Sequence, residues 1–217
     1  LKIPYTISLH GLDINLAIEN KPKLTKKILD KAKAIITNTQ NTASIIEPLG
    51  IDKSKIHVLH PGLDFDTSYD EDKLKAWRKK LNIQDDDKVI MTLGRLSKRK
   101  GQDIMIEALA QIKNDYRLKY FIIGKGHEKK YLESLISKYK LTKNIFIFDN
   151  IEDEELIYFF KLADIFAMPH QEMGSDVEGF GMVFLEAATC RLPIIAGDSG
   201  GIKELFNSSE QAILVPG

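Results

Sequence analysis

The sequence alternates short apolar runs with longer segments whose apolar residues recur at helical spacing. The apolar runs are four to seven residues long, the length of buried strands. We expect strands at 5–9, 34–38, 56–60, 89–94, 120–124, 145–149, 164–169, 192–197 and 212–216. A chain that repeats strand and helix in this order favours parallel sheets with crossover helices, so the sequence predicts an α/β fold.

Four segments between these strands have the periodicity or the ends of helices. In 103–113, the residues Ile104, Leu109 and Ile112 share one side, and 128–141 repeats the pattern. The segment 153–163 begins with an acidic turn, which suits the positive end of a helix dipole. The fourth expected helix covers 184–191.

Domain boundaries follow from a polar, charge-rich stretch at 61–87, which is bracketed by Pro61 and three consecutive aspartates. We expect a linker with one short helix there. The residues 88–217 after it hold a nearly complete doubly wound parallel sheet, truncated at its C-terminus. The residues 1–60 before it hold three strands, too few to close a second such sheet. They therefore predict part of a second α/β domain.

The composition excludes several classes of protein. The chain has 217 residues, with 31 Lys and Arg against 31 Asp and Glu, so no overall field recruits nucleic acid. Cys190 is the only cysteine, which excludes an internal disulfide and suits a reducing, cytoplasmic compartment. No apolar stretch reaches the ~20 residues of a membrane span. Because Leu1 is not a start methionine and opens almost directly on a strand, we expect a fragment.

The stretch 21–33 carries six lysines and one aspartate. A basic amphipathic helix of this kind can lie on an anionic membrane surface. A solvated helix face is the alternative, and the sequence favours it by about two to one.

A basic loop follows the strand at 89–94. Arg95 and Lys100 lie five residues apart after Gly94, on a loop that leads into a helix. A planar guanidinium and a compact ammonium together can neutralise a diphosphate whose charge grows as its bond to a sugar breaks. The neighbouring Lys98 and Arg99 are expected to be solvated.

A glycine-rich turn with two carboxylates precedes and enters the helix at 184–191. The N–H groups of Gly181, Met182 and Val183 can point at phosphate oxygens, helped by the helix dipole. Glu186 lies roughly 7 Å further along the axis than Gly181. Glu178 suits a sugar and Glu186 a ribose, because carboxylates bind vicinal hydroxyls. The alternative for Glu186 is a solvent-facing side chain, but its apolar surroundings predict partial burial.

Other motifs are weaker. Gly124 and Gly126 follow a strand, where glycine allows close approach of a ligand but also makes a plain tight turn. His10 ends the first strand, and a lone histidine is more often structural than catalytic. No spacing of ligand residues resembles a zinc site, and no P-loop sequence occurs.

With these residues together, the chain resembles the retaining GT-B glycosyltransferases of group 1, also called family four. The matching pieces are HG at 10–11, VLHPGLD at 58–64, LGRLSKRKGQD at 93–103, FIIGKG at 121–126, DVEGFGMVFLEA at 176–187 and GDSGGIKE at 197–204. The pair of glutamates eight residues apart around EGFG is the most specific of them. The resemblance covers nearly the whole chain and implies two Rossmann-like domains, an acceptor domain ending near residue 60 and a donor domain from 88.

The resemblance implies a role for each site residue. Arg95 and Lys100 would hold the donor diphosphate, Glu178 would contact the transferred sugar and Glu186 the ribose. His10 would approach the sugar, and Asn150 and Ile151 would border the base. The phosphate site would be completed by backbone around Gly94, Gly124, Gly179, Phe180, Gly181, Met182 and Val183.

The implied reaction is transfer of a hexose, with retained configuration, from a GDP- or UDP-linked sugar to a glycan or lipid-linked acceptor. The resemblance implies no divalent metal and no other cofactor. It is compatible with a cytoplasmic protein that contacts the inner face of a membrane peripherally. Most of the family's acceptor domain and its closing C-terminal helix do not occur in the sequence, so we expect the fragment alone to be inactive. Alternatives are a noncatalytic nucleotide-sugar binding module, a GT-B sugar-nucleotide epimerase and a phosphorylase, although no acid and base pair or pyridoxal-binding lysine can be assigned.

Overall fold

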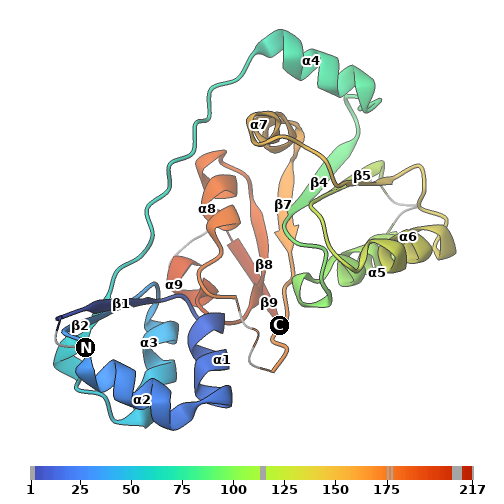
Figure 1. Cartoon of the computed structure of the whole chain (residues 1–217). Coiled ribbons are helices and arrows are strands. Elements are labelled where there is room, and N and C mark those ends of the chain that lie inside the picture. The colour runs from blue at the N-terminus through green and yellow to red at the C-terminus, as the bar shows by residue number, and fades with distance from the viewer. Residues whose placement is uncertain (1–2, 113–115, 175, 177, 207–211, 217) are drawn as a thin grey trace. The chain divides into compact units, whose positions relative to one another are not determined.

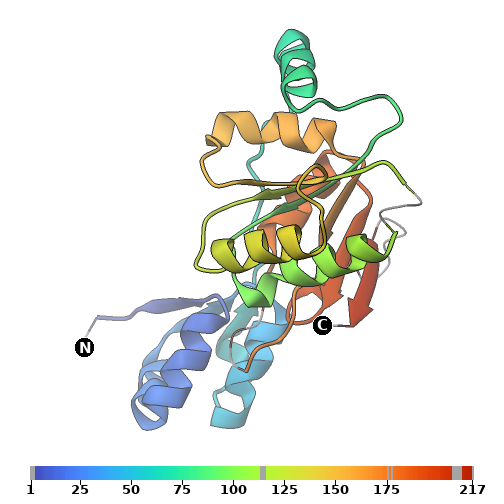
Figure 2. The ribbon, with the colours of Figure 1, turned by 90° about the vertical axis from the view of Figure 1, so that its right-hand side faces the viewer.

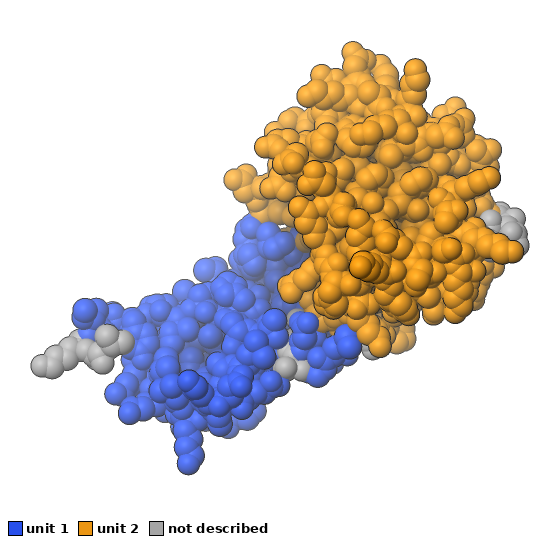
Figure 3. Space-filling view, turned by 45° about the vertical axis from the view of Figure 1, so that its right-hand side comes forward, with its two compact units in different colours: residues 1–62, 172–182, 198–208 blue, residues 63–171, 183–197, 209–217 orange. Residues whose placement is uncertain are grey.

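A computed structural model describes residues 3–112, 116–174, 176, 178–206 and 212–216. The chain forms two compact units, each made from several stretches of sequence. Unit 1 comprises 1–62, 172–182 and 198–208, and unit 2 comprises 63–171, 183–197 and 209–217, as coloured in Figure 3.

Unit 2 is built on a six-stranded sheet in the order β6-β5-β4-β7-β8-β9 (Figure 1). The strands are β4 (Lys88–Leu93), β5 (Leu118–Ile123), β6 (Ile145–Phe148), β7 (Ile165–Met168), β8 (Ile194–Asp198) and β9 (Ala212–Pro216). The pairings β4–β5, β4–β7, β5–β6 and β7–β8 are all parallel. From β4 the chain adds β5 and β6 on one side, and it then returns to the other side of β4 to add β7, β8 and β9. The sheet is therefore doubly wound. The predicted α/β fold is confirmed.

Helices cover both faces of this sheet because its central strands are apolar on both sides. All six residues of β5 are buried. The helices α5 (Gln102–Ile112) and α6 (Lys129–Lys138) lie along one face (Figure 2), where Ile106 and Leu135 pack with Tyr120 and Ile122. On the other face, Phe166 of β7 packs against Phe160 of α7 (Asp153–Leu162) and Phe184 of α8 (Met182–Thr189).

Unit 1 contains a three-stranded parallel sheet, β1-β2-β3. Its strands are β1 (Thr6–Leu9), β2 (Ala34–Thr37) and β3 (Ile56–Val58), and its helices are α1 (Leu12–Asn20), α2 (Pro22–Lys31), α3 (Gln40–Ile46) and α9 (Ile202–Phe206). The apolar core around Ile35 and Ile46 is buried between sheet and helices. Two segments from late in the sequence, 172–182 and 198–208, belong to this unit, and the second contains α9.

All nine predicted strands are present, each within two residues of its predicted ends. The four predicted helices correspond to α5 to α8, although Lys113, the last residue predicted for α5, lies outside the described residues. The short helix expected within 61–87 is α4 (Glu71–Lys80), which packs on α7 through Trp77, whose ring centroid lies 5.0 Å from that of Phe159. The helices α1, α3 and α9 were not predicted.

Candidate functional site

The basic loop of unit 2 lies at the carboxyl end of β4 and folds back over its first residue. Arg95 is exposed, whereas Lys100 is buried, with 9% of its surface accessible. The Lys100 side chain crosses Gly94: its Cε lies 3.6 Å from where a Cβ of Gly94 would stand. Gly101 has φ +70°, and a Cβ at this position would stand 2.2 Å from the carbonyl oxygen of Pro169, the residue after β7. The loop therefore joins the carboxyl ends of β4 and β7, where the strand order reverses.

Arg99 does not fit the prediction of a solvated neighbour. It is as buried as Lys100, at 9% exposure, and its carbonyl accepts a hydrogen bond from the N–H of Gln171 at 2.7 Å. Only Lys98 of the expected pair is exposed. The prediction was wrong for Arg99 because a short 3₁₀ helix at Lys98–Lys100 turns this residue inward, and sequence charge alone does not show that turn.

Gly124 is a glycine because of the neighbouring loop. A Cβ on Gly124 would stand 2.0 Å from the carbonyl oxygen of Gly94, and a Cβ on Gly126 would stand 2.0 Å from that of Leu96. Both distances are far below van der Waals contact. The sequence left two interpretations of Gly124, close approach of a ligand and a plain tight turn, and these backbone contacts are a direct structural reason for the turn. The same packing brings Gly124 beside Gly94 at the carboxyl edge of the sheet.

Glu186 is half-buried on α8, as its apolar surroundings predicted. Burial raises the pKa of its carboxyl group, and the negative charge of Asp153 raises it further. Asp153 begins α7 directly after the segment that contains Asn150 and Ile151, so Glu186 lies within electrostatic range of that segment. The preceding residue, Asp149, forms an ion pair with Lys129 at the start of α6, which holds the loop after β6 and lowers the pKa of Asp149.

In unit 1, the chain at Glu178 and Gly179 is enclosed by backbone on two sides. A Cβ on Gly179 would stand 2.5 Å from the His10 carbonyl oxygen. On the other side, Cβ atoms on Gly200 and Gly201 would stand 2.1 and 2.2 Å from the carbonyl oxygens of Glu178 and Gly179. The N–H of Gly201 donates to the Glu178 carbonyl at 3.0 Å. Glu178 itself is half-buried.

His10 and His60 flank this segment. His10 is exposed at the end of β1, with its N–H donating to Asp13 and its Nε2 lying 3.2 Å from Ser8 Oγ. The His60 ring stacks on buried Phe180, with 5.6 Å between ring centroids. Gly181 follows at φ +77°, and α8 begins at Met182, so the first N–H groups of this helix have no partner inside it.

The predicted site residues thus form two groups, one in each unit. Unit 2 holds Gly94, Arg95, Lys100, Gly124, Asn150, Ile151, Val183 and Glu186, and unit 1 holds His10, Glu178, Gly179, Phe180, Gly181 and Met182. Sequence reasoning missed His60, Asn38, Gly200, Gly201 and Glu204, although the paired glycines at 200–201 were a visible signal. Among the described residues, no group of three or more His, Cys, Asp or Glu side chains could hold a metal ion.

Two family models match the chain. The model described as "Glycosyl transferases group 1" matches residues 74–217, and that described as "Glycosyltransferase Family 4" matches residues 1–67. Their meeting point falls inside the stretch 61–87 that the sequence predicts as a linker.

Curated relatives include a GDP-mannose-dependent monoacylated alpha-(1-6)-phosphatidylinositol monomannoside mannosyltransferase of Corynebacterium glutamicum. It is 41% identical over 139 residues, which cover 62% of this chain and 35% of the relative. A GDP-mannose-dependent alpha-(1-6)-phosphatidylinositol monomannoside mannosyltransferase of Mycolicibacterium smegmatis is 34% identical over 164 residues, or 73% of this chain and 42% of the relative. The chain spans less than half the length of these relatives.

Solved structures share the fold. The Anabaena protein Alr3699/HepE, crystallised with UDP and glucose, superposes with a TM-score of 0.83 at 23% identity, over 98% of this chain and 58% of its own. Sucrose-phosphate synthase from Thermosynechococcus elongatus superposes with a TM-score of 0.79 at 21% identity, over 100% of this chain and 55% of its own.

Proposed function

Because the chain belongs to the group 1 glycosyltransferases and has a fold of the GT-B type, we propose that the whole protein transfers a hexose from a GDP- or UDP-linked sugar to a lipid-linked or glycan acceptor. The names of the two curated relatives given above, both GDP-mannose-dependent phosphatidylinositol monomannoside mannosyltransferases, support a lipid-linked acceptor and make GDP-mannose the first donor to test. The complex of the Anabaena protein with UDP keeps a uridine donor in consideration.

The observation that carries this proposal is the position of the basic loop. In doubly wound sheets, ligands bind outside the carboxyl ends of the strands where the strand order reverses. In unit 2 this reversal falls between β4 and β7, and the loop from Gly94 to Gly101 lies there with four cationic residues, Arg95 and Lys100 among them. Lys100 is largely desolvated, so its charge acts in a lower dielectric than that of an exposed lysine. Arg95 and Lys100 therefore suit a diphosphate.

The remaining contacts follow from the order of groups along a nucleotide sugar. Glu186 accepts hydrogen bonds from the ribose hydroxyls, and Asn150 with Ile151 borders the base. This pairing is supported by the charge of Asp153, which acts on Glu186 and lies two residues after Ile151. The amides of Gly181 to Val183, at the start of α8, donate to phosphate oxygens. Glu178 contacts the transferred sugar, and His10, close to Gly179, approaches the same sugar.

We propose that transfer retains the anomeric configuration. The bond between C1 of the sugar and the β-phosphate oxygen breaks, and the acceptor oxygen bonds to C1 on the same face. The acceptor hydroxyl gives its proton to the departing phosphate oxygen, so no side chain acts as a nucleophile. Arg95, Lys100 and the start of α8 stabilise the charge that develops on the diphosphate, the role that a metal ion has in other transferases. Chelation with EDTA should therefore leave the rate unchanged.

A calorimetric titration of the whole protein tests this assignment, with UDP, GDP, ADP and their hexose conjugates as ligands. Arg95→Ala and Lys100→Ala should each weaken diphosphate binding by ~1.5 to 3 kcal/mol, the range of a charged hydrogen bond. Lys98→Ala is the matched control, because Lys98 is exposed on the same loop and should bind like the wild type. Equal affinities in all three variants would remove the donor site from this loop. Binding without any hexose transfer would instead indicate a binding module.

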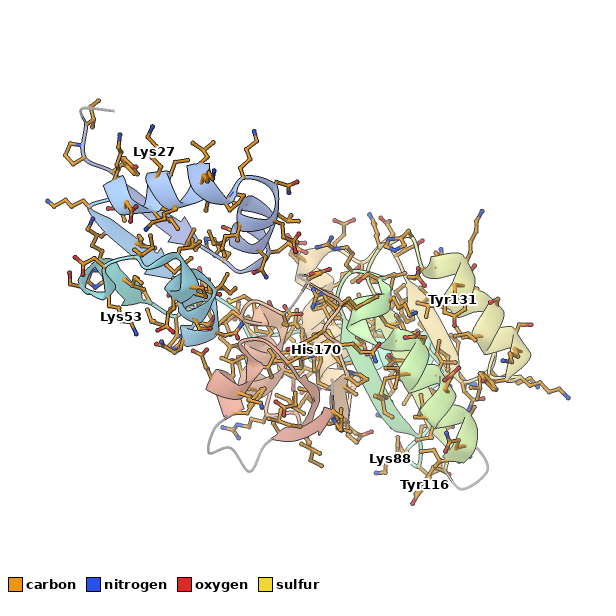
Figure 4. The ribbon with its side chains drawn as sticks, turned by 90° about the horizontal axis from the view of Figure 1, so that it is seen from below. Lys27, Lys53, Lys88, Tyr116, Tyr131 and His170 are labelled. Carbon is orange, nitrogen blue, oxygen red and sulfur yellow. The ribbon has the colours of Figure 1, made fainter. Side chains whose placement is uncertain are left out.

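We propose in addition that α2 contacts an anionic membrane surface. Leu24 and Ile28 are 49% and 42% exposed on this helix, beside exposed Lys23 and Lys27. The labelled Lys27 extends from the outer side of α2 in Figure 4. Exposed apolar side chains beside cations match the boundary of an anionic bilayer. No helix among the described residues has the length and apolarity needed to cross a membrane.

A further inference from the structure

Glu204 of α9 contacts a helix that lies more than 160 residues earlier in the chain. Its Oε2 accepts the backbone N–H of Gln40 and its Oε1 accepts that of Asn41, both at 2.7 Å. Gln40 and Asn41 are the first two residues of α3, whose N–H groups have no acceptor within their own helix. The carboxylate thus satisfies two N–H groups at once and lies at the positive end of the helix dipole.

From the start of α3, a buried polar network leads to His10. Thr39 is the N-cap, and its Oγ1 accepts the N–H of Thr42 at 3.0 Å. The Thr42 hydroxyl donates to Asn38 Oδ1 at 2.7 Å, and Asn38 Nδ2 donates to the His10 carbonyl at 3.4 Å. Thr39 and Thr42 are fully buried and Asn38 nearly so, which keeps water from competing for these bonds.

The same network also reaches the aromatic pair beside Glu178. The Asn38 carbonyl lies 2.9 Å from His60 Nδ1, and the His60 ring stacks on Phe180. Both histidines that flank the Glu178 segment are therefore held through Asn38.

Glu204 is connected to Glu178 from its own side as well. Gly200 and Gly201 directly precede α9, which begins at Ile202. Gly200 lies against the carbonyl of Glu178, and Gly201 lies against that of Gly179. The Glu178 carbonyl accepts the N–H of Gly201. Moving α9 away from α3 would move these glycines with it and release the backbone of Glu178 from one side.

We propose that Glu204 is a positioning residue, whose contact with the start of α3 holds the segment of Glu178 and Gly179 in place, with Gly179 against the His10 carbonyl. The inference rests on the proposed function, in which Glu178 and His10 both approach the transferred sugar. Glu204 is not one of the residues proposed to contact the donor. A shift of about 1 Å at the reacting centre can cost on the order of 100-fold in rate, so the contact affects turnover more than nucleotide binding.

The test compares Glu204→Gln, Glu204→Asp and the wild type in the whole protein. The glutamine side chain has one oxygen that can accept a hydrogen bond from one of the two backbone N–H groups, and its NH₂ group then faces the other N–H group. Glu204→Gln should therefore lower kcat by roughly 10- to 100-fold. The nucleotide Kd should stay within about threefold, because Arg95, Lys100 and Glu186 are intact. Glu204→Asp keeps both oxygens on a shorter stem and should recover part of kcat. Lys203→Gln is the control, because Lys203 lies next to Glu204 on the same helix, is exposed and forms an ion pair with Asp198.

Hydrogen exchange provides a readout that needs no substrate. In Glu204→Gln, amides of residues 40–46 and of residues 178–182 should both exchange faster, whereas those of β5 should not change. Unchanged exchange at 178–182 together with unchanged kcat would overturn the proposal. If the wild type binds no nucleotide sugar, the proposed function fails instead, and the exchange measurement still decides whether Glu204 holds the Glu178 segment.

Discussion

At the scale of single residues, Glu186 predicts how donor binding depends on pH. Its carboxyl has a raised pKa because burial and Asp153 disfavour the charged form. The ionised form is the one that accepts hydrogen bonds from ribose hydroxyls. Donor affinity should therefore be highest at pH values above this raised pKa and should fall as the pH drops through it.

Calorimetry with a nucleotide sugar between pH 7.5 and pH 5 measures this effect, because a diphosphate diester does not itself titrate there. Glu186→Gln should bind about tenfold more weakly at pH 7.5 and should lose the pH dependence. The same substitution should weaken donor binding but raise the free energy of unfolding at pH 7.5. Since the folded protein disfavours the ionised carboxylate, the variant should melt slightly higher at pH 7.5. An identical pH slope in both proteins would contradict the ribose contact.

The sequence predicted the chemistry of the candidate site residues better than it predicted their structural surroundings. The sequence indicated that Glu186 is half-buried, because a lone carboxylate among apolar residues leaves few alternatives. It could not show that Gly124 faces the Gly94 carbonyl, because a close approach between two loops depends on strand pairing. It could not show that Arg99 turns inward either, because four adjacent polar residues look alike until the 3₁₀ turn is known.

At the scale of secondary structure elements, α4 packs on α7 through an aromatic contact. Trp77 packs on Phe159, and Lys80 Nζ lies 4.0 Å from the Trp77 ring centroid. Trp77→Ala should lower the free energy of unfolding by about 2 kcal/mol, from lost apolar burial and the lost aromatic pair. For a chain of this size, that corresponds to roughly 4 to 8 °C in Tm.

Thermal unfolding followed by circular dichroism measures the loss, and Lys75→Ala on the exposed side of α4 is the control. Trp77 is the only tryptophan, so its fluorescence reports the contact directly. In Phe159→Leu, the emission should shift to longer wavelength as the ring gains water. A Trp77→Ala protein with unchanged Tm would show that α4 is not held by this residue.

The strands were predicted nearly completely because buried parallel strands leave continuous apolar runs. The helices α1, α3 and α9 were missed for a physical reason. The last two are seven and five residues long, too short to show a helical period. The helix α3 depends on its Thr39 cap and on Glu204, and the second of these partners is remote in sequence.

At the scale of the whole molecule, the α2 surface predicts selective binding to anionic vesicles. Each lysine near such a surface contributes ~1 kcal/mol, so replacing Lys23 and Lys27 by glutamine should weaken binding by about 2 kcal/mol, roughly thirtyfold. Flotation with vesicles of phosphatidylcholine containing phosphatidylglycerol measures this affinity. Phosphatidylcholine alone should bind poorly.

Two further variants separate charge from apolar contact. Leu24→Ser with Ile28→Ser should weaken binding with the lysines intact. Lys53→Gln is the control, because Lys53, which is labelled in Figure 4, is exposed elsewhere in unit 1 and pairs with Glu47. If that control loses as much affinity as the α2 variants, general charge rather than this helix accounts for binding, and the solvated-face interpretation of residues 21–33 holds.

Sequence reasoning divided the chain into consecutive domains, and at this scale it had no means to do otherwise. Composition marks where a linker starts, but it carries no information on which distant loops pack together. The membership of 172–182 and 198–208 in unit 1 depends on glycine contacts such as Gly179 with His10. Such contacts leave no periodic signal.

The discontinuous unit 1 also has a consequence for biosynthesis. Gln40 leaves the ribosome 164 residues before Glu204, its hydrogen-bond partner. At 5–20 residues per second, the start of α3 waits on the order of ten seconds or more for that carboxylate. Unit 1 therefore cannot complete its native contacts while it is being translated, and a nascent chain must keep this helix end solvated or shielded until most of unit 2 has been made.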